Sequence, residues 1–290
     1  MTLTPKTPLW PPRATRLRLG SRTLRVATTG EGPPLLLLNG IGGNIEMWEP
    51  VARRMAGRRV VMVDMPGTGG SPALVVPQRL HGYAALVVDL LDELGIARSV
   101  VLGYSWGGAL AQELAHRAPE RVNALVLAAT MPGVGGQPPA PWVMALMATP
   151  ARYYSRTYLR VVAPLVFGSA PARAADSPSG DARLRKPPTL RGYTQQLYAI
   201  TGWSSRHYLR TLRTPVLVVA GSHDPLVRPR NARILARLVP GAQLTFVEGG
   251  HLFLLEQPDE GCRIVSAFLD EHGLHAPDLT ATQPGTRSST

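Results

Sequence analysis

The stretch VLGYSWGGALAQ, residues 101–112, decides how this chain folds around Ser105. The apolar run before the serine is typical of a short buried strand, and residues 109–118 repeat their apolar side chains with helical spacing. Gly103 and Gly107 lie two residues on either side of the serine. A tight strand-to-helix turn needs small residues there, because a Cβ atom would collide with neighbouring backbone. The pattern Gly-x-Ser-x-Gly therefore predicts a nucleophile elbow, which lifts the serine hydroxyl above the end of a sheet.

An ordinary strand-to-helix connection, with glycines that pack against the helix, would give the same five-residue pattern. The interpretation of Ser105 as a nucleophile therefore depends on partners elsewhere in the chain.

Buried strands and helices alternate along most of the sequence. Continuous apolar runs occupy residues 34–39, 59–64, 99–104, 124–130 and 215–221, and an alternating run follows at 243–248. Amphipathic stretches lie between most of them, at residues 46–55, 80–94, 109–118, 231–238 and 257–269. Two alternating segments around a Gly-Ser turn, within residues 16–30, indicate an opening antiparallel hairpin. The pattern predicts the α/β class, with a mostly parallel sheet of about eight strands and helices on both faces.

The alternation stops between Met131 and Arg213, where proline, methionine, tryptophan and tyrosine are frequent. We interpret residues 131–213 as a cap inserted over the active end of the sheet, with a flexible, charged excursion at 168–188. The other divisions are an N-terminal extension at 1–14, the two parts of the core at 15–130 and 214–272, and a disordered tail at 273–290.

Two residues downstream of Ser105 have the positions that its partners need. A serine hydroxyl is a poor nucleophile until an oriented base takes its proton. Asp224 follows the apolar run at 215–221, and His251 follows the last predicted strand. Both lie just beyond the carboxyl ends of predicted strands, where open α/β sheets build their sites. His223 lies in the loop of the acid, before the last strand, so we predict the triad Ser105, Asp224 and His251.

A serine nucleophile also needs backbone donors for the oxyanion that forms when it attacks a carbonyl carbon. One is expected to be the N–H of Trp106, directly after the serine. The other is expected to be the N–H of Ile41, in the glycine-rich loop after residues 34–39. That loop lacks the lysine and the glycine spacing of nucleotide-binding loops, so we expect no nucleotide to bind there.

The composition narrows the classes of partner. The chain has 31 Lys and Arg residues against 19 Asp and Glu, but only Lys6 and Lys186 are lysine, and the arginines are scattered. Clusters of basic and aromatic residues typical of nucleic-acid binders are missing, so we expect no nucleic-acid partner. We also expect no transmembrane segment and no secretory signal, because no apolar run is long enough. The single Cys262 fits a reducing cytoplasm, and the sequence has no motif for a metal or an organic cofactor.

Six stretches together resemble the α/β-hydrolase family from about Pro33 to Phe268: NGIGGN (39–44), DMPGTGGS (64–71), YSWGGALAQ (104–112), LVLAAT (125–130), GWSSRHYL (202–209) and GGHLFLL (249–255). Within that family they are similar to the intracellular poly(3-hydroxyalkanoate) depolymerases of the medium-chain-length type. Asn39-Gly40 in place of the frequent His-Gly, and Trp106 after the serine, carry this finer likeness. Residues 169–188 depart most from the family's pattern.

The resemblance implies the α/β-hydrolase fold, with Ser105 as nucleophile, Asp224 as acid and His251 as base. It further implies cleavage of polyester bonds, through an acyl-enzyme, to 3-hydroxy acids or oligomers at storage granules in the cytoplasm. Apolar side chains of the cap suit alkyl groups of such a substrate, and the candidates for binding it are Trp142, Met144 and Trp203.

Other functions share the same residues. A carboxylesterase or lactonase acting on small soluble esters would use identical machinery, and so would cofactor-free perhydrolysis of carboxylic acids. Epoxide and haloalkane hydrolases need an aspartate at the position of Ser105 and are disfavoured. A non-catalytic granule-binding module on the same scaffold would be expected to lack a triad member, whereas this chain has all three.

Overall fold

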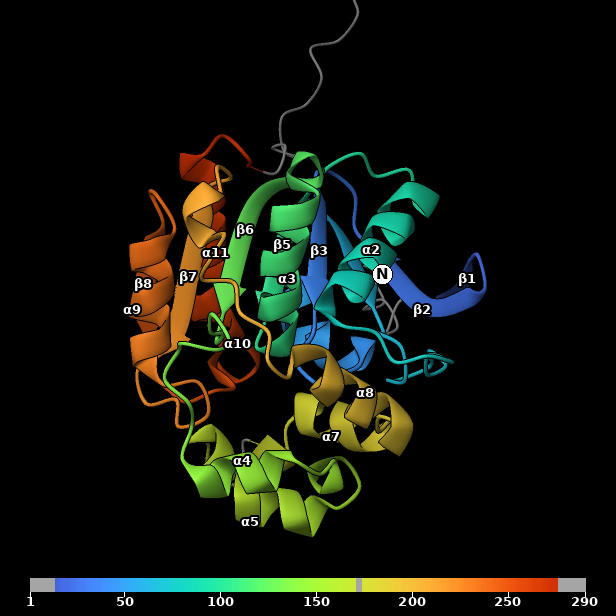
Figure 1. Cartoon of the computed structure of the whole chain (residues 1–290), viewed down its shortest axis with the longest axis vertical. Coiled ribbons are helices and arrows are strands. Elements are labelled where there is room, and N and C mark those ends of the chain that lie inside the picture. The colour runs from blue at the N-terminus through green and yellow to red at the C-terminus, as the bar shows by residue number, and fades with distance from the viewer. Residues whose placement is uncertain (1–13, 171–173, 276–290) are drawn as a thin grey trace, which may run out of the picture.

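A single twisted sheet forms the centre of the molecule (Figure 1), in a computed structural model that describes residues 14–170 and 174–275. Its eight strands are β1 (Thr15–Leu19), β2 (Arg22–Thr29), β3 (Pro34–Leu38), β4 (Arg59–Val63), β5 (Ser99–Tyr104), β6 (Val122–Ala128), β7 (Val216–Gly221) and β8 (Gln243–Val247). The spatial order is β1-β2-β4-β3-β5-β6-β7-β8. The β1–β2 and β2–β4 pairs are antiparallel and all the other neighbours are parallel, which confirms the predicted sheet.

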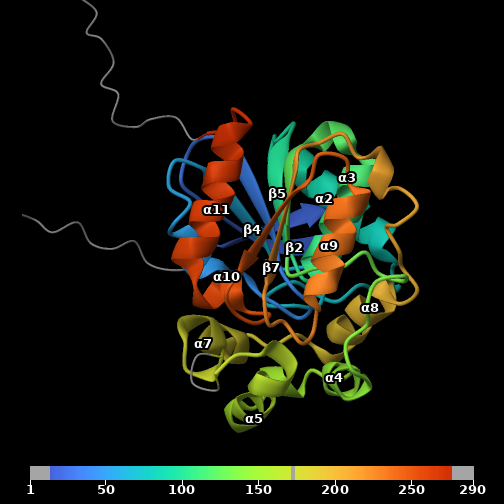
Figure 2. The same ribbon diagram turned by 90° about the vertical axis from the view of Figure 1, so that its left-hand side faces the viewer.

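Helices cover both faces of the sheet, as predicted (Figure 2). One face carries α2 (Leu80–Glu93), α3 (Trp106–Arg117) and α9 (Pro229–Leu238). The other carries α1 (Glu49–Ala52), α10 (Phe253–Glu256) and α11 (Pro258–Glu271). Successive residues of a strand point to opposite faces, so Leu36 and Leu38 enter one core while Leu35 and Leu37 enter the other. The continuous apolar strands in the sequence follow from this two-sided burial.

The segment between β6 and β7, called the cap below, lies over the carboxyl ends of the parallel strands (Figures 1 and 2). Its helices are α4 (Pro141–Met147), α5 (Arg156–Phe167), α7 (Pro178–Arg185) and α8 (Leu190–Ile200). Gly133 and Ser204 form an antiparallel bridge that joins the two ends of the cap. The predicted N-terminal extension and disordered tail fall mainly on residues 1–13 and 276–290, outside the described residues.

The expected flexible excursion at 168–188 is different in the structure. From residue 174 onward it is ordered, and Ser177 caps α7 by accepting a hydrogen bond from the N–H of Gly180 at 3.1 Å. The side chain of Ala182 is buried against the core. The charge pattern misled the prediction, because Asp176 and Asp181 pair with basic side chains of α5 instead of facing water alone.

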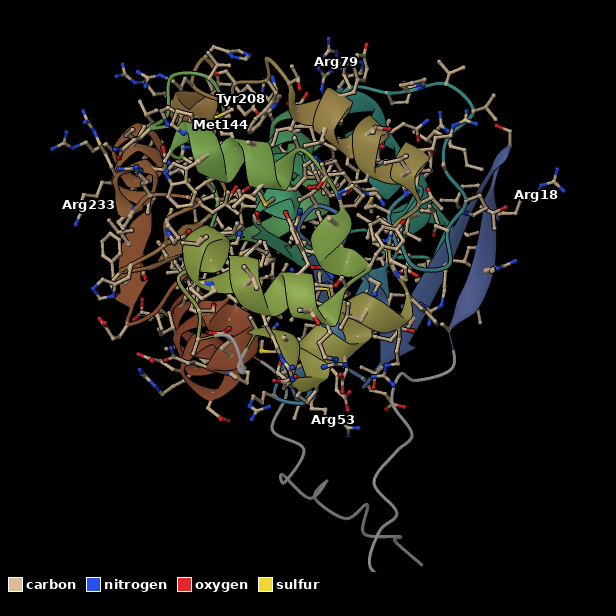
Figure 3. All side chains as sticks on the ribbon, turned by 90° about the horizontal axis from the view of Figure 1, so that it is seen from below. Arg18, Arg53, Arg79, Met144, Tyr208 and Arg233 are labelled. Carbon is tan, nitrogen blue, oxygen red and sulfur yellow. The ribbon has the colours of Figure 1, made fainter. Side chains whose placement is uncertain are left out.

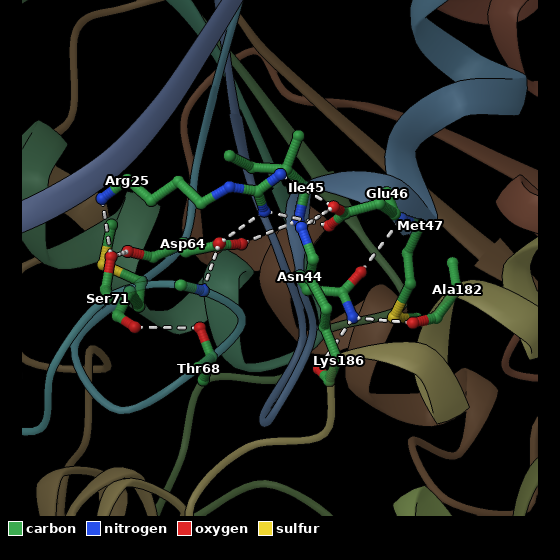
Figure 4. Close-up of polar contacts among 12 residues, drawn as sticks. Arg25, Asn44, Ile45, Glu46, Met47, Asp64, Thr68, Ser71, Ala182 and Lys186 are labelled. Atoms are coloured by element: carbon green, nitrogen blue, oxygen red, sulfur yellow. Dashed lines mark hydrogen bonds and ion pairs between the residues drawn. The ribbon is translucent and has the colours of Figure 1, made fainter. Parts of the chain in front are cut away.

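A buried charged cluster joins the cap to the core (Figure 4). Arg25 of β2 donates to Asp64 at 2.9 Å and to Glu46 at 2.7 Å, and Lys186 of the cap donates to the same Glu46 at 2.5 Å. Burial alone would raise the pKa of Glu46. The hydrogen bonds from the two cations outweigh that effect and hold the pKa below its usual value. Glu46 is therefore an ionised link between the sheet and the cap.

Candidate active site

Ser105 occupies a strained turn between β5 and α3. Its φ of 55° and ψ of −116° lie in a region that residues with a side chain rarely adopt. The turn is fixed by the N–H of Ser105, which donates to the carbonyl of Ala128 at 2.9 Å. A Cβ atom on Gly103 would lie 2.4 Å from the carbonyl oxygen of Gly107, and one on Gly107 would lie 2.1 Å from that of Leu38. Both glycines are thus required by close backbone approaches around the serine.

The structure brings Ser105, His251 and Asp224 together. The Oγ atom of Ser105 lies 3.0 Å from Nε2 of His251, and Nδ1 of the same ring lies 2.7 Å from Oδ2 of Asp224. The side chains of His251 and Asp224 are 4% and 0% exposed. Because a carboxylate bonded to Nδ1 fixes the tautomer with a free Nε2, the ring can accept the proton of the serine hydroxyl.

Hydrogen bonds hold the carboxylate of Asp224 and the backbone of His251 in place. Oδ1 of Asp224 accepts hydrogen bonds from the N–H groups of Leu226 and Val227, both at 2.8 Å, which orient the carboxylate with Oδ2 toward His251. The phenol of Tyr104 donates to the carbonyl oxygen of His251 at 2.5 Å. Burial raises the pKa of Tyr104 well above its usual value, and the charge of Asp224 raises it further, so this phenol stays protonated and keeps donating.

The alternative histidine lies outside this arrangement. The side chain of His223 is 68% exposed, and its Nδ1 lies 2.9 Å from an oxygen of Glu248. His223 thus faces water and a surface carboxylate, although it is the direct neighbour of Asp224 in the sequence.

The loop after β3 lies beside the serine, as expected for an oxyanion loop. A Cβ atom on Gly40 would lie 3.4 Å from the Cβ of Ser105. The N–H groups of Gly40, Gly42 and Gly43 each donate to an acceptor, at 2.9, 2.8 and 3.0 Å. The N–H of Ile41 has no acceptor among the described residues. Trp106 is the first residue of α3, so its N–H has no acceptor within the helix either.

Two cavities meet at Ser105. The larger has a volume of about 390 Å³ and mostly apolar walls, which include Trp106, Ala109, Met144, Met147, Leu226 and Val227. The smaller extends from Ser105 past His251 and Phe167 to two arginines of the cap, Arg152 and Arg183. Ile41 and Met147 line both cavities, so they lie at the junction where a bound ester would meet the serine.

The three substrate-binding candidates lie in different places. Met144 lines the large cavity next to Ser105 and is labelled on α4 in the view of the cap (Figure 3). Trp142 lines a separate surface cavity together with His223 and Arg230. The indole of Trp203 donates to Glu113 at 2.9 Å, two turns along α3 from the serine. A role in substrate binding stays a prediction for all three, and the observed position favours it for Met144.

Sequence reasoning missed the buried arginines. Arg152 and Arg183 are two of many arginines in the chain, and the second lies in the stretch that was expected to be flexible. Their only sequence signal is their place within the cap. Across residues 14–170 and 174–275 no three His, Cys, Asp or Glu side chains gather as a metal group would, and none of the helices is long and apolar enough to span a membrane.

Comparison with known proteins identifies the family. The family model described as alpha/beta hydrolase fold matches residues 33–258. A poly(3-hydroxyalkanoate) depolymerase of Ectopseudomonas oleovorans is 38% identical over 259 residues, covering 88% of this chain and 92% of the relative. A pimeloyl-[acyl-carrier protein] methyl ester esterase of Nitrosomonas europaea is 31% identical over 260 residues, covering 85% of this chain and 98% of the relative.

A solved structure of an enol-lactonase also resembles this chain. The enol-lactonase from Burkholderia xenovorans LB400 has a TM-score of 0.78 at 26% identity, covering 88% of this chain and 100% of that one. These findings confirm the family resemblance that the sequence motifs indicated. The chain belongs to the α/β-hydrolase family.

Proposed function

We propose that this protein is a serine ester hydrolase that cleaves poly(3-hydroxyalkanoate), or oligomers of it, to 3-hydroxy acids. The observation that carries the proposal is the hydrogen-bonded series Ser105–His251–Asp224 at the mouth of an apolar cavity of about 390 Å³. The depolymerase of Ectopseudomonas oleovorans, at 38% identity, supports the choice of substrate class.

The reaction follows from the roles of these three side chains. Nε2 of His251 accepts the proton as Oγ of Ser105 attacks the ester carbonyl carbon. The N–H groups of Ile41 and Trp106 stabilise the oxyanion, and the ion pair with Asp224 stabilises the imidazolium. The carbon–oxygen bond then breaks, His251 gives its proton to the departing alcohol, and the acyl group stays on Ser105. A water molecule, activated by the same imidazole, releases the acid.

The side chains of the cap are consistent with an apolar substrate. Met144 and Met147 contribute flexible apolar walls to the cavity, which suits alkyl side chains of varying length. The cap also exposes the apolar residues Val134, Trp142 and Val161 to solvent. An exposed apolar surface suits adsorption to a hydrophobic granule, and we propose that the protein acts on such granules in the cytoplasm.

A small-molecule carboxylesterase or lactonase is the second candidate, supported by the esterase and lactonase names of relatives at 31% and 28% identity. Purified protein is incubated with amorphous medium-chain polyester granules and, separately, with p-nitrophenyl octanoate. We expect 3-hydroxy acids from the granules as well as nitrophenol from the ester. Hydrolysis of the soluble ester alone would favour the second candidate, and hydrolysis of neither would contradict both.

A further inference from the structure

Two arginine side chains are buried beside the reacting serine. Arg152 and Arg183 belong to the cap, are 2% and 4% exposed, and line the smaller cavity together with Ser105 and His251. Arginine is rarely buried unless it is paired. The contacts of the two arginines show how far their burial is compensated within the protein.

The two arginines differ in their bonding. Arg152 donates to the carbonyl oxygen of Thr149 at 2.9 Å and to the phenol of Tyr193 at 2.8 Å. Nε and Nη1 of Arg183 are buried and have no hydrogen-bond partner among the described residues, and the same holds for Nε of Arg152. Arg183 therefore has two unpartnered donor groups, whereas Arg152 has one and uses both of its other nitrogens for bonds within the cap.

Aromatic rings pack against Arg183, and one of them also packs against the base. Its guanidinium lies 5.1 Å from the ring centre of Tyr153 and 5.0 Å from that of Phe167. The ring of Phe167 in turn stacks on His251, with centroids 6.0 Å apart and planes at 14°. The ring of Phe167 thus contacts both Arg183 and the imidazole that handles the proton.

The burial of Arg183 is unfavourable as it stands. Removal from water lowers the pKa of Arg183, and the nearby charge of Arg152 also lowers it, while Tyr153 and Glu256 partly oppose these effects. A buried charge without enough hydrogen bonds destabilises a fold. An anion entering the cavity would remove that penalty and gain charge-assisted hydrogen bonds.

The position of His251 indicates which part of the substrate occupies the smaller cavity, beside the two arginines. The departing alcohol has to lie next to the group that protonates it. His251 lines only the arginine cavity, whereas of the two oxyanion donors Trp106 lines only the apolar cavity and Ile41 lines both. The accessible space beside the arginines is about 20 Å³, enough for one or two water-sized groups but not for an alkyl chain. The carboxylate of the departing hydroxy acid fits this space, and the alkyl group on its β carbon has to lie outside it.

We propose that Arg183 binds the free carboxylate of the departing hydroxy acid, so that the enzyme removes 3-hydroxy acid units from the carboxyl end of the chain. This inference rests on the proposed function and adds the end of the polymer at which it acts. In a 3-hydroxy acid ester, only the α and β carbons separate the carboxylate from the scissile oxygen. The acyl–oxygen bond breaks, His251 protonates the alkoxide, and the hydroxy acid leaves with its carboxylate still ionised.

The test compares two soluble dimers of 3-hydroxyoctanoate, one with a free carboxylate and one whose end group is the neutral primary amide. Chromatography of the released hydroxy acid gives kcat/KM for the same internal ester bond in both. We expect the wild type to prefer the carboxylate dimer by about ten- to a hundredfold, the range for a hydrogen bond to a charged group. Since this comparison needs no variant, it does not depend on the folding of one.

Two variants then test whether the preference for the carboxylate dimer depends on Arg183. Arg183→Met fills the space between the aromatic rings without a charge and should bring the carboxylate-to-amide ratio close to one. Arg185→Met removes the same charge from an exposed position on the same helix and should keep the wild-type ratio. A ratio that survives in Arg183→Met would overturn the assignment of Arg183, and so would a ratio lost equally in both variants.

The outcomes separate this inference from the proposed function. Equal hydrolysis of the two dimers by the wild type would overturn carboxylate recognition and leave an ester hydrolase. Hydrolysis of neither dimer, together with no activity on p-nitrophenyl octanoate, would overturn the proposed function itself and this inference with it.

Discussion

The loops of the sheet and the helices of the cap both line the space around Ser105, but they contribute different things. The sheet contributes Ser105, Asp224 and His251 from turns whose backbone is tightly held by hydrogen bonds and glycine contacts. The cap contributes side chains, the apolar Met144 and the cationic Arg183. This division suggests that the sheet determines the chemistry and the cap determines which ester is accepted.

The largest expected effect lies on the sheet side of this comparison. Ser105→Ala removes the nucleophile, and we expect kcat on p-nitrophenyl octanoate to fall by about five to six orders of magnitude, as when a triad serine is lost. The thermal unfolding temperature should change little, because alanine retains the Cβ atom. Substantial activity in the folded variant would remove Ser105 from its proposed role.

The second prediction contrasts two histidines that follow neighbouring strands. His251→Ala should cost several orders of magnitude in kcat, because His251 is the side chain that contacts both Ser105 and Asp224 and can take the proton. His223→Ala should change kcat less than about twofold, since exposed substitutions away from the site have small effects. The opposite result would exchange the assignments of the two residues.

The third prediction tests the cap through substrate length. Burying the four methylene groups that distinguish an octanoate from a butyrate ester is worth up to about 3 kcal/mol. Ordering a longer chain costs part of that. We therefore expect kcat/KM on p-nitrophenyl octanoate to exceed that on the butyrate at least about tenfold. A flat profile, or a maximum at acetate, would contradict the medium-chain proposal.

Variants of the candidate residues sharpen this test. Met144→Ala should reduce the octanoate-to-butyrate ratio severalfold, because Met144 lines the apolar cavity. Trp142→Ala and Trp203→Ala serve as comparisons and should leave the ratio nearly unchanged, since these rings lie at another cavity and at Glu113. A larger change from either tryptophan than from Met144 would mean that the acyl group binds elsewhere in the cap.

The same division explains what could be predicted from the sequence. Strands buried on both faces leave continuous apolar runs, and the turn at Ser105 tolerates only small neighbours, so both are visible in a single chain. The parallel arrangement brings the ends of β5, β7 and β8 to one edge. The order of strands along the chain is therefore enough to place Asp224 and His251 near the serine.

The roles of the cap residues were harder to predict from the sequence, because the direction of a side chain there depends on tertiary packing. Its helices have apolar residues both inward and outward, so composition alone could not tell that Met144 lines the cavity while Trp142 does not. The charge of a residue was an equally poor guide to its burial in the cap. Arg183 and Arg185 are neighbours on α7, yet one is buried beside the active site and the other faces water.

The smallest expected effect concerns the junction between the two regions. Glu46 accepts hydrogen bonds from Arg25 of the sheet and Lys186 of the cap, and its side chain is only 8% exposed. Glu46→Gln should lower the free energy of unfolding by about 2 kcal/mol at neutral pH, because it leaves two cations poorly satisfied. Arg25 keeps its bond to Asp64, which limits the loss.

The pH dependence tests the cause of that loss. The pKa of Glu46 is lower in the folded than in the unfolded protein, so its contribution is complete above the unfolded pKa and is lost as the pH falls through the folded one. The difference between wild type and Glu46→Gln, from denaturant unfolding, should therefore be full at pH 7 and shrink in acid below about pH 4. Glu49→Gln is the matched control, because Glu49 pairs with Arg53 at the surface and should contribute less than about 0.5 kcal/mol. A difference that stays constant with pH would mean that the shape of the Glu46 side chain, and not its charge, joins the cap to the sheet.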